Sequence, residues 1–117
     1  HCKVSPETEA MVDASAFALM KTTAIIVNAG RASIVDQAAL LDALRNKRIA
    51  GAALDVFWEE PLPSNHPLLA LDNVTITPHL AGASYDVPGR QSRMIVEDIE
   101  RWIRGERPRN VWNRDAL

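Results

Sequence analysis

The sequence predicts an α/β fold built on a parallel β-sheet. The first of three apolar runs, residues 24–28, is continuous and lacks the alternation that a half-exposed strand shows. This pattern is typical of a strand that is buried on both faces of a parallel sheet. Two more apolar runs follow at residues 52–57 and 74–77. A helical segment separates the first two runs, and strand–helix–strand units of this kind almost always have a right-handed crossover.

The composition is that of a folded domain without a strong charge. The chain has 117 residues, of which 47% are hydrophobic, so a single domain with a real core is expected. Its 13 basic and 15 acidic side chains are mixed along the chain and leave a net charge of -2. This balance gives no reason to expect nucleic acid or an anionic membrane as a partner. No apolar run approaches the roughly 20 residues that span a bilayer. A single cysteine, Cys2, and the absence of a signal-peptide pattern predict a cytoplasmic protein.

Helix starts can be read from capping residues in the first half of the chain. Ser5-Pro6 predicts one start, because serine caps helices and proline suits the first helical position. Asp13 predicts a short helix over residues 14–20, and Asp36 predicts a helix that ends near residue 46. The apolar residues of the latter helix share one face, which would pack on the sheet: Ala39, Leu40, Ala43 and Leu44.

The second half of the chain predicts one long loop, one long helix and a tail. Residues 58–73 contain several prolines and no helical period, so they are expected to form a loop. A helix is expected from residue 84 or 86 to residue 104, and Gly105 would end it. Residues 106–117 are expected to form an extended tail.

Three chemically useful side chains follow the predicted strands. Arg31, Glu60 and His79 come after the first, second and third strand, and the carboxyl ends of parallel strands meet at one edge of a sheet. A guanidinium group binds carboxylates through a planar set of donors. Histidine exchanges a proton near neutral pH, and a neighbouring carboxylate would orient its ring. Together these groups predict a site that binds an anionic carbonyl compound and moves a proton onto its oxygen.

Each candidate also has a purely structural explanation. Arg31 could be a loop arginine in a surface ion pair, and Glu60 could be one of many exposed acids. Asp55 lies within an apolar predicted strand, and a buried carboxylate requires donors. These donors would come either from the backbone of a neighbouring loop or from an amide or hydroxyl group of a ligand. A nucleophilic pair of Cys2 with His79 is a formal alternative, His66 reads as a loop residue, and no spacing suits a metal site.

Three stretches resemble, in order and spacing, the NAD(P)-dependent D-2-hydroxyacid dehydrogenase family. The first is Val27-Asn28-Ala29-Gly30-Arg31, followed by Val35-Asp36. The second is Gly51-Ala52-Ala53-Leu54-Asp55-Val56-Phe57, followed by Glu60-Pro61-Leu62. The third is Thr77-Pro78-His79, followed by Ala81-Gly82-Ala83-Ser84. The resemblance extends from residue 1 to at least residue 113.

This resemblance implies a fold, a reaction and a role for each matching position. The fold would be the second half of a Rossmann-like, doubly wound parallel sheet with a closing C-terminal helix. The reaction would transfer a hydride between NAD or NADP and a small 2-keto or 2-hydroxy acid. Arg31 would anchor the substrate, and His79, held by Glu60, would be the acid/base. Asp55 would hold the nicotinamide carboxamide, and the other cofactor contacts would be Asn28, Ala29, Gly30, His79 and Gly82.

Two departures from the family pattern matter. Ala32 stands where the family usually has glycine, and a positive φ there would cost alanine about 1 kcal/mol. The chain also has no G-x-G-x-x-G motif, and its three predicted strands are half of the roughly six in a dinucleotide-binding domain. We therefore interpret residues 1–105 as a partial dinucleotide-binding domain and residues 106–117 as a tail that returns toward a missing substrate domain.

A fragment of this kind has expected consequences for assembly and function. An exposed sheet edge favours self-association, so we expect a homo-oligomer, and the fragment alone is expected to have no dehydrogenase activity. The alternative function on the same scaffold is an NAD-sensing binding protein of the corepressor type. A third alternative is a purely structural module, but it would not explain why Arg31, Glu60 and His79 follow the three predicted strands.

Overall fold

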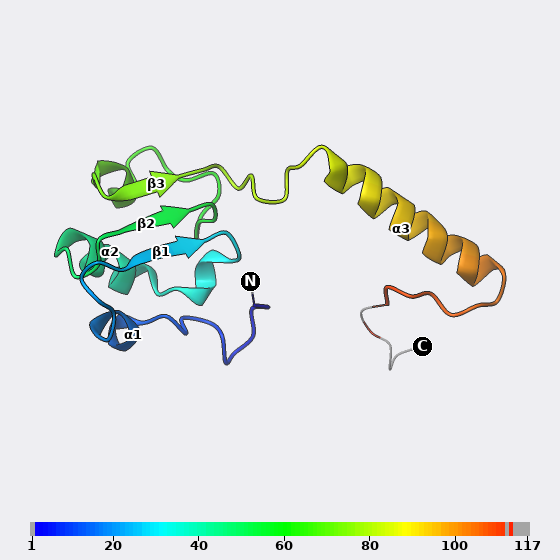
Figure 1. Ribbon diagram of the computed structural model, residues 1–117, viewed down its shortest axis with the longest axis horizontal. Helices are drawn as coiled ribbons and strands as arrows, with labels where there is room; N and C mark the ends of the chain where they lie inside the picture. Colours follow the sequence, from blue (N-terminus) through cyan, green and yellow to red (C-terminus); the bar gives the residue numbers. More distant parts are fainter. Residues whose placement is uncertain (1, 112, 114–117) are drawn as a thin grey trace. The chain divides into compact units, whose positions relative to one another are not determined.

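The computed structural model describes residues 2–111 and 113 and divides into two compact units, His1–Ala81 and Gly82–Leu117 (Figure 1). The first, called here the N-terminal unit, contains the sheet. The second, the C-terminal unit, contains one long helix and the chain that follows it. The end of the predicted tail, residues 112 and 114–117, lies outside the described residues.

The N-terminal unit is a three-stranded parallel sheet in the order β1-β2-β3. Its elements, in chain order, are α1 (Ala14–Ala18), β1 (Ile25–Asn28), the short 3-10 helix η1 (Ala32–Ile34), α2 (Gln37–Arg45), β2 (Gly51–Leu54), the 3-10 helix η2 (Pro67–Ala70) and β3 (Val74–Ile76). In the register of the sheet, Ile26 pairs with Ala52, which pairs with Val74. The predicted α/β fold with a parallel sheet is therefore confirmed.

Aspartate caps begin both α-helices of this unit, as the sequence predicts. The Asp13 side chain accepts a hydrogen bond from the Ala16 N–H at 2.9 Å, and the Asp36 side chain accepts one from Ala39 at 2.7 Å. Each cap satisfies one of the backbone donors that a helix start leaves without an intrahelical partner. These caps fix where α1 and α2 begin relative to the strands that precede and follow them.

The core lies between the helices and one face of the sheet. Leu40 and Leu44 of α2 are almost completely buried, and Phe17 of α1 packs beside them. The sheet contributes alternate residues to this core, which are Ile26 of β1, Ala52 and Leu54 of β2, and Val74 and Ile76 of β3. Alternate residues of a strand point to opposite faces, so these side chains define the covered face.

The prediction that the first strand is buried on both faces is wrong for this unit. Ile25 and Val27 of β1 are 66% and 72% exposed, and Thr75 of β3 is exposed on the same side of the sheet. Within the N-terminal unit, both α-helices contribute to the core on the opposite face. The continuous apolar run therefore belongs to a strand with two apolar faces. The helices of this unit cover one of these faces, and the other is exposed.

Three local expectations also need correction. Ser5-Pro6 begins a hydrogen-bonded turn and not a helix, because Ala10 turns to φ 50° and its N–H bonds to the carbonyl of Ser33. The second strand ends at Leu54, so Asp55 lies just beyond it and not inside it. The predicted loop, residues 58–73, contains η2. Leu68 of this short helix is buried in the core, although the sequence around it shows no helical period.

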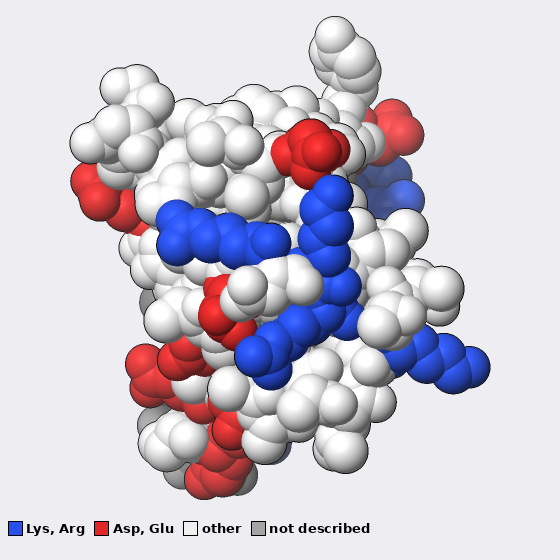
Figure 2. Space-filling view, turned by 90° about the vertical axis from the view of Figure 1, so that its left-hand side faces the viewer, with Lys and Arg blue, Asp and Glu red and all other residues white. Residues whose placement is uncertain are grey.

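The amino ends of the strands form the edge opposite to the predicted site. Figure 2 looks onto this end and shows Lys and Arg side chains gathered across its middle, with most Asp and Glu side chains toward its margins and some between the basic ones. Exposed basic residues stand in the chain just before β1 and β2, namely Lys21, Arg45, Lys47 and Arg48. Charges that are mixed along the sequence are therefore partly separated on this face.

Gly51→Ala is expected to destabilise the N-terminal unit by about 1–3 kcal/mol. A Cβ at Gly51 would lie 2.6 Å from the carbonyl oxygen of Asn73, which accepts the hydrogen bond of Ala52 at the start of the β2–β3 pairing. The urea midpoint can be followed through Trp58, whose indole Nε1 donates to the Val35 carbonyl at 3.0 Å, after Trp102 and Trp112 are changed to Phe. An unchanged urea midpoint would contradict this prediction, because it would mean that β2 and β3 accommodate the added Cβ without a loss of stability.

The C-terminal unit consists of α3 (Asp86–Ile103) and the chain that turns back beside it. Gly105, at φ 74°, ends the helix as predicted. The carboxylate of Asp98 then accepts hydrogen bonds from the N–H groups of Arg109 and Asn110, at 2.7 and 2.9 Å. These bonds hold the returning chain against the helix. Among the described residues, no helix combines the length and apolar character needed to cross a membrane.

Candidate active site

The segments that follow the three strands are joined at the carboxyl edge of the sheet. The Asp55 N–H donates to the Asn28 carbonyl at 2.9 Å, which ties the end of β2 to the end of β1. The Thr77 N–H donates to the Leu54 carbonyl at 3.0 Å and ties β3 to β2 in the same way. The loops that carry the candidate residues therefore leave the sheet side by side.

The turn after β1 presents Arg31. The Asn28 side chain builds this turn, because its Oδ1 accepts from the Gly30 N–H at 3.1 Å and its Nδ2 donates to the Arg31 carbonyl at 3.0 Å. The Arg31 guanidinium donates to the Gly30 carbonyl at 2.9 Å and is exposed. No ion pair joins it to any residue in the described part of the chain. Its charge is available to a ligand.

Alanine is accommodated at position 32 without backbone strain. Among described residues other than glycine, a positive φ occurs at Ala10, Lys47 and His79. Ala32 instead begins η1, and its side chain is buried at 7% exposure. The expected penalty at this departure from the family pattern therefore does not arise.

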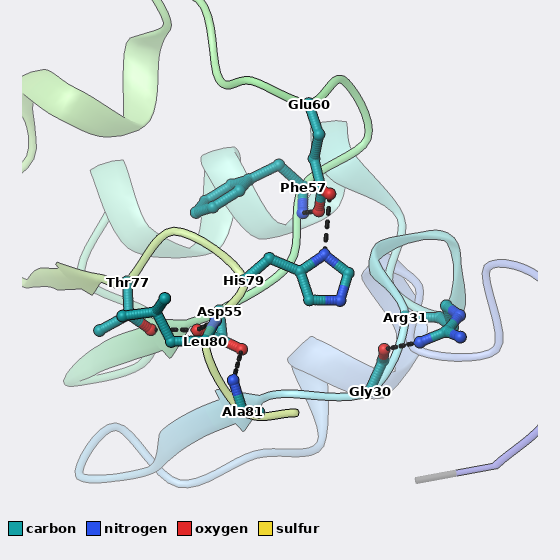
Figure 3. Close-up of polar contacts among 9 residues, drawn as sticks. All are labelled: Gly30, Arg31, Asp55, Phe57, Glu60, Thr77, His79, Leu80 and Ala81. Atoms are coloured by element: carbon teal, nitrogen blue, oxygen red, sulfur yellow. Dashed lines mark hydrogen bonds and ion pairs between the residues drawn. The ribbon is translucent and has the colours of Figure 1, made fainter. Parts of the chain in front are cut away.

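Glu60 and His79 form a hydrogen-bonded pair. Glu60 Oε2 lies 2.8 Å from His79 Nδ1, and Glu60 Oε1 accepts from the Phe57 N–H at 3.0 Å (Figure 3). A carboxylate can only accept, so Nδ1 carries the proton and Nε2 is the ring nitrogen left for other partners. Figure 3 shows the ring between Glu60 and the turn that carries Arg31. The hydrogen bond from His79 is the largest cause that holds the pKa of Glu60 below its ordinary value.

Asp55 is buried and accepts three hydrogen bonds from the segment around His79. Its Oδ1 accepts from the Thr77 hydroxyl and from the Leu80 N–H, and its Oδ2 accepts from the Ala81 N–H, both amides at 2.8 Å (Figure 3). The Thr77 bond is the largest cause that lowers the pKa of Asp55, followed by the Leu80 bond. Backbone donors from a neighbouring loop, one of the two explanations open from the sequence, therefore account for the burial of this carboxylate.

His79 itself has a left-handed backbone, with φ 55°. Its N–H donates to the Thr77 carbonyl at 3.0 Å, which closes a tight turn between β3 and Leu80. This conformation is uncommon for a residue other than glycine and persists where surrounding contacts determine it. The turn presents the ring toward Glu60.

The other predicted residues fall into different places. Ala29 and Gly30 lie in the Asn28 turn, whereas Gly82 is the first residue of the C-terminal unit and is not among the residues gathered here. His66 is more than a loop residue: its Nδ1 accepts from the Leu68 N–H at 3.2 Å, and its Nε2 lies 2.8 Å from the side-chain amide of Gln37. Cys2 is exposed. Within the described residues, no three of His, Cys, Asp and Glu are grouped to hold a metal ion.

Sequence reasoning missed the donors to Asp55. Leu80 and Ala81 act through backbone N–H groups, which no residue type encodes. Thr77 is a different case, because a hydroxyl directly before Pro78-His79 was a visible signal. The sequence prediction places Thr77 at the end of the third strand and in the Thr77-Pro78-His79 stretch but assigns it no role as a donor.

Acid is expected to destabilise the N-terminal unit. The pKa values of Glu60 and Asp55 are lower in the folded unit than their ordinary 4.5 and 3.8, so the unfolded chain binds more protons as pH falls through this range. The stabilisation is therefore complete above the ordinary values and is lost as pH drops through the folded ones. The urea midpoint, followed by Trp58 fluorescence, should fall between about pH 5 and pH 3.

A matched pair of variants tests the origin of this effect. Glu60→Gln removes one of the carboxylates whose pKa is lowered in this unit and should reduce the pH dependence. Glu59→Gln changes a neighbouring exposed acid that has no hydrogen bond or ion pair in the described part of the chain, and it should keep the full dependence. Equal pH profiles for the two variants would contradict the assignment.

The parallel three-stranded sheet, with the candidate residues gathered at the carboxyl ends of its strands, places this chain in the class of open α/β proteins, which bind their ligands at that edge. The sequence matches, over residues 1–81, the family described as "D-isomer specific 2-hydroxyacid dehydrogenase, NAD binding domain". The chain belongs to this family.

Similar proteins are whole enzymes of which this chain spans a part. A glyoxylate reductase of Aeropyrum pernix is 45% identical over all of this chain, which covers 35% of that protein. A D-3-phosphoglycerate dehydrogenase of Methanocaldococcus jannaschii is 42% identical over 97% of this chain and 21% of its own length. A solved D-isomer specific 2-hydroxyacid dehydrogenase from Xanthobacter autotrophicus Py2, in complex with NADPH and MES, matches with a TM-score of 0.83 and 43% identity, over 99% of this chain and 48% of that one. The chain thus spans about a third of the A. pernix relative's length.

Proposed function

We propose that this chain is the catalytic part of a longer oxidoreductase that interconverts a D-2-hydroxy acid and its 2-keto acid with NAD or NADP. The observation that carries the proposal is the pair formed by His79 Nδ1 and Glu60 Oε2, 2.8 Å apart, on the same sheet edge as Arg31. Glyoxylate is the first substrate to test, because relatives from Aeropyrum pernix and Korarchaeum cryptofilum are glyoxylate reductases.

Arg31 is assigned to the substrate carboxylate. Its guanidinium is exposed and has no carboxylate partner among the described residues, so an incoming acid would not need to displace one. The Asn28 side chain holds the turn from which Arg31 projects. A bidentate contact to the carboxylate would leave the keto carbon beside the histidine.

His79 is assigned to proton transfer at the keto oxygen. Glu60 holds Nδ1, so Nε2 gives a proton to the oxygen during reduction and takes it back during oxidation. The carboxylate stabilises the imidazolium that carries the extra proton, and the Phe57 N–H keeps that carboxylate from rotating away.

Asp55 and the Asn28 turn are the parts of this chain that we assign to the nicotinamide cofactor. Asp55 accepts three donors, and a carboxylate has about four acceptor positions, so one remains for an amide such as the nicotinamide carboxamide. The Asn28 turn, with Ala29 and Gly30, lies beside it at the sheet edge and offers small residues for a close approach. When bound, the nicotinamide would supply or accept the hydride.

The proposal is tested on the full-length protein that contains this chain. Oxidation of NADH and of NADPH would be followed with glyoxylate, hydroxypyruvate and pyruvate, and we expect turnover with at least one of them. Cofactor binding without turnover of any 2-keto acid would contradict the assignment and favour a nucleotide-sensing binding protein.

A further inference from the structure

Among the described residues, the hydrogen-bond donors to the Asp55 carboxylate all come from the short segment that also contains His79. The Thr77 hydroxyl, the Leu80 N–H and the Ala81 N–H surround the two carboxylate oxygens, and His79 lies between these donors in the chain (Figure 3). We call Asp55, Thr77, Leu80 and Ala81 the Asp55 cluster. This segment therefore bonds to one buried carboxylate, that of Asp55, and it also carries the His79 ring that bonds to Glu60.

The backbone of His79 needs such a support. Its φ of 55° is one that residues with a side chain rarely adopt, and the 3.0 Å bond from its own N–H to the Thr77 carbonyl is local to the turn. In the described part of the chain, the two amides that follow it have Asp55 as their hydrogen-bond partner. The direction of the imidazole therefore depends on where the carboxylate points.

Among the three donors, only the Thr77 hydroxyl belongs to a side chain. It shares Oδ1 with the Leu80 N–H and so adds a third bond to the two amide bonds that hold the carboxylate. Without it, Oδ1 is held by one amide alone, and the carboxylate and the turn can shift together. On the ring side, His79 bonds to Glu60, whose other oxygen accepts from the Phe57 N–H, and neither bond involves the backbone of the turn that carries His79.

We propose that Thr77 is a positioning residue for His79, acting through Asp55 to hold the imidazole opposite Glu60. The catalytic meaning of this role rests on the proposed function, but the geometry that it predicts does not. Two variants separate the hydroxyl from the shape of the side chain: Thr77→Val removes the hydroxyl and keeps the shape, and Thr77→Ser keeps the hydroxyl and removes the methyl group.

The readout is the imidazole of His79 in the 117-residue chain, observed by ¹H–¹⁵N correlation spectra of the histidine rings. The His79 signals are assigned by their absence from His79→Gln. His66 serves as an internal reference, because its ring is held by Leu68 and Gln37 within the same unit. We expect Thr77→Val to lose the signature of the Nδ1–H bonded to Glu60 while the His66 signals stay in place, and Thr77→Ser to restore it.

Two results would overturn the proposal. If the His79 signals of Thr77→Val match those of the unchanged chain, the hydroxyl does not position the ring. If Thr77→Val and Asp55→Asn both displace the His66 signals as well, the cluster supports the fold as a whole and not His79 in particular. These spectra require neither cofactor nor substrate. A negative result for Thr77 is therefore distinct from an absence of dehydrogenase activity in the full-length protein.

Discussion

Replacing His79 with glutamine in the full-length protein is expected to lower kcat for keto-acid reduction by about 10²–10⁴-fold. Glutamine can still donate to Glu60, but it has no ring nitrogen that binds and releases a proton near neutral pH. The loss should appear in kcat more than in KM, because the substrate carboxylate is assigned to Arg31. Steady-state rates with saturating NADH or NADPH measure both quantities.

His66→Gln is the matched control for this experiment. It makes the same substitution at a histidine that caps η2 and contacts Gln37, away from the Glu60–His79 pair. The control should retain most of its kcat, with any change expressed in stability. A His79→Gln enzyme that turns over as fast as the control would remove His79 from the proton-transfer role.

Leu40→Ala is expected to destabilise the N-terminal unit by about 2–5 kcal/mol, a large share of the roughly 5–15 kcal/mol that stabilises a typical domain. Leu40 of α2 is 0% exposed and packs in the core between the helix and the sheet. Its truncation removes apolar contacts and leaves a cavity that the surrounding side chains fill only in part. Urea unfolding followed by Trp58 measures the loss.

The same substitution at an exposed leucine separates burial from residue type. Leu19, directly after α1, is 89% exposed, so Leu19→Ala should change the free energy of unfolding by no more than about 0.5 kcal/mol. Similar losses for the two variants would mean that the covered face of the sheet is not the core that stabilises this unit.

The sequence predicted the parts of the fold that local chemistry determines. Asp13 and Asp36 each cap a helix because a carboxylate accepts from the first free N–H groups, and that rule needs no tertiary information. The three strands and the sharing of one edge by Arg31, Glu60 and His79 followed from apolar runs and from the geometry of parallel sheets. The pairing of Glu60 with His79 is a hypothesis of the same strand-end reasoning and is also implied by the family resemblance; in the structure Glu60 Oε2 and His79 Nδ1 lie 2.8 Å apart.

What could not be predicted depends on contacts between distant segments. The end of β2 at Leu54 and the burial of Asp55 depend on two amides about 25 residues further along the chain. Ser5-Pro6 has the residue types of a helix start, yet the bond from Ala10 to Ser33 ends the turn early. The exposure of Ile25 and Val27 reflects which face the unit's own helices cover, and a strand's sequence does not contain that information.

The shortness of β3 bears on how activity and folding are coupled. This strand has three residues and pairs with β2 alone in the described sheet, whereas β2 is paired on both sides. Local opening of β3 therefore breaks few bonds, and it would draw Thr77 and His79 away from Asp55 and Glu60 while α2 stays packed. His79 therefore follows an edge strand that few backbone hydrogen bonds hold to the sheet. On heating, this unit would lose the contact between His79 and Glu60 before it loses its core.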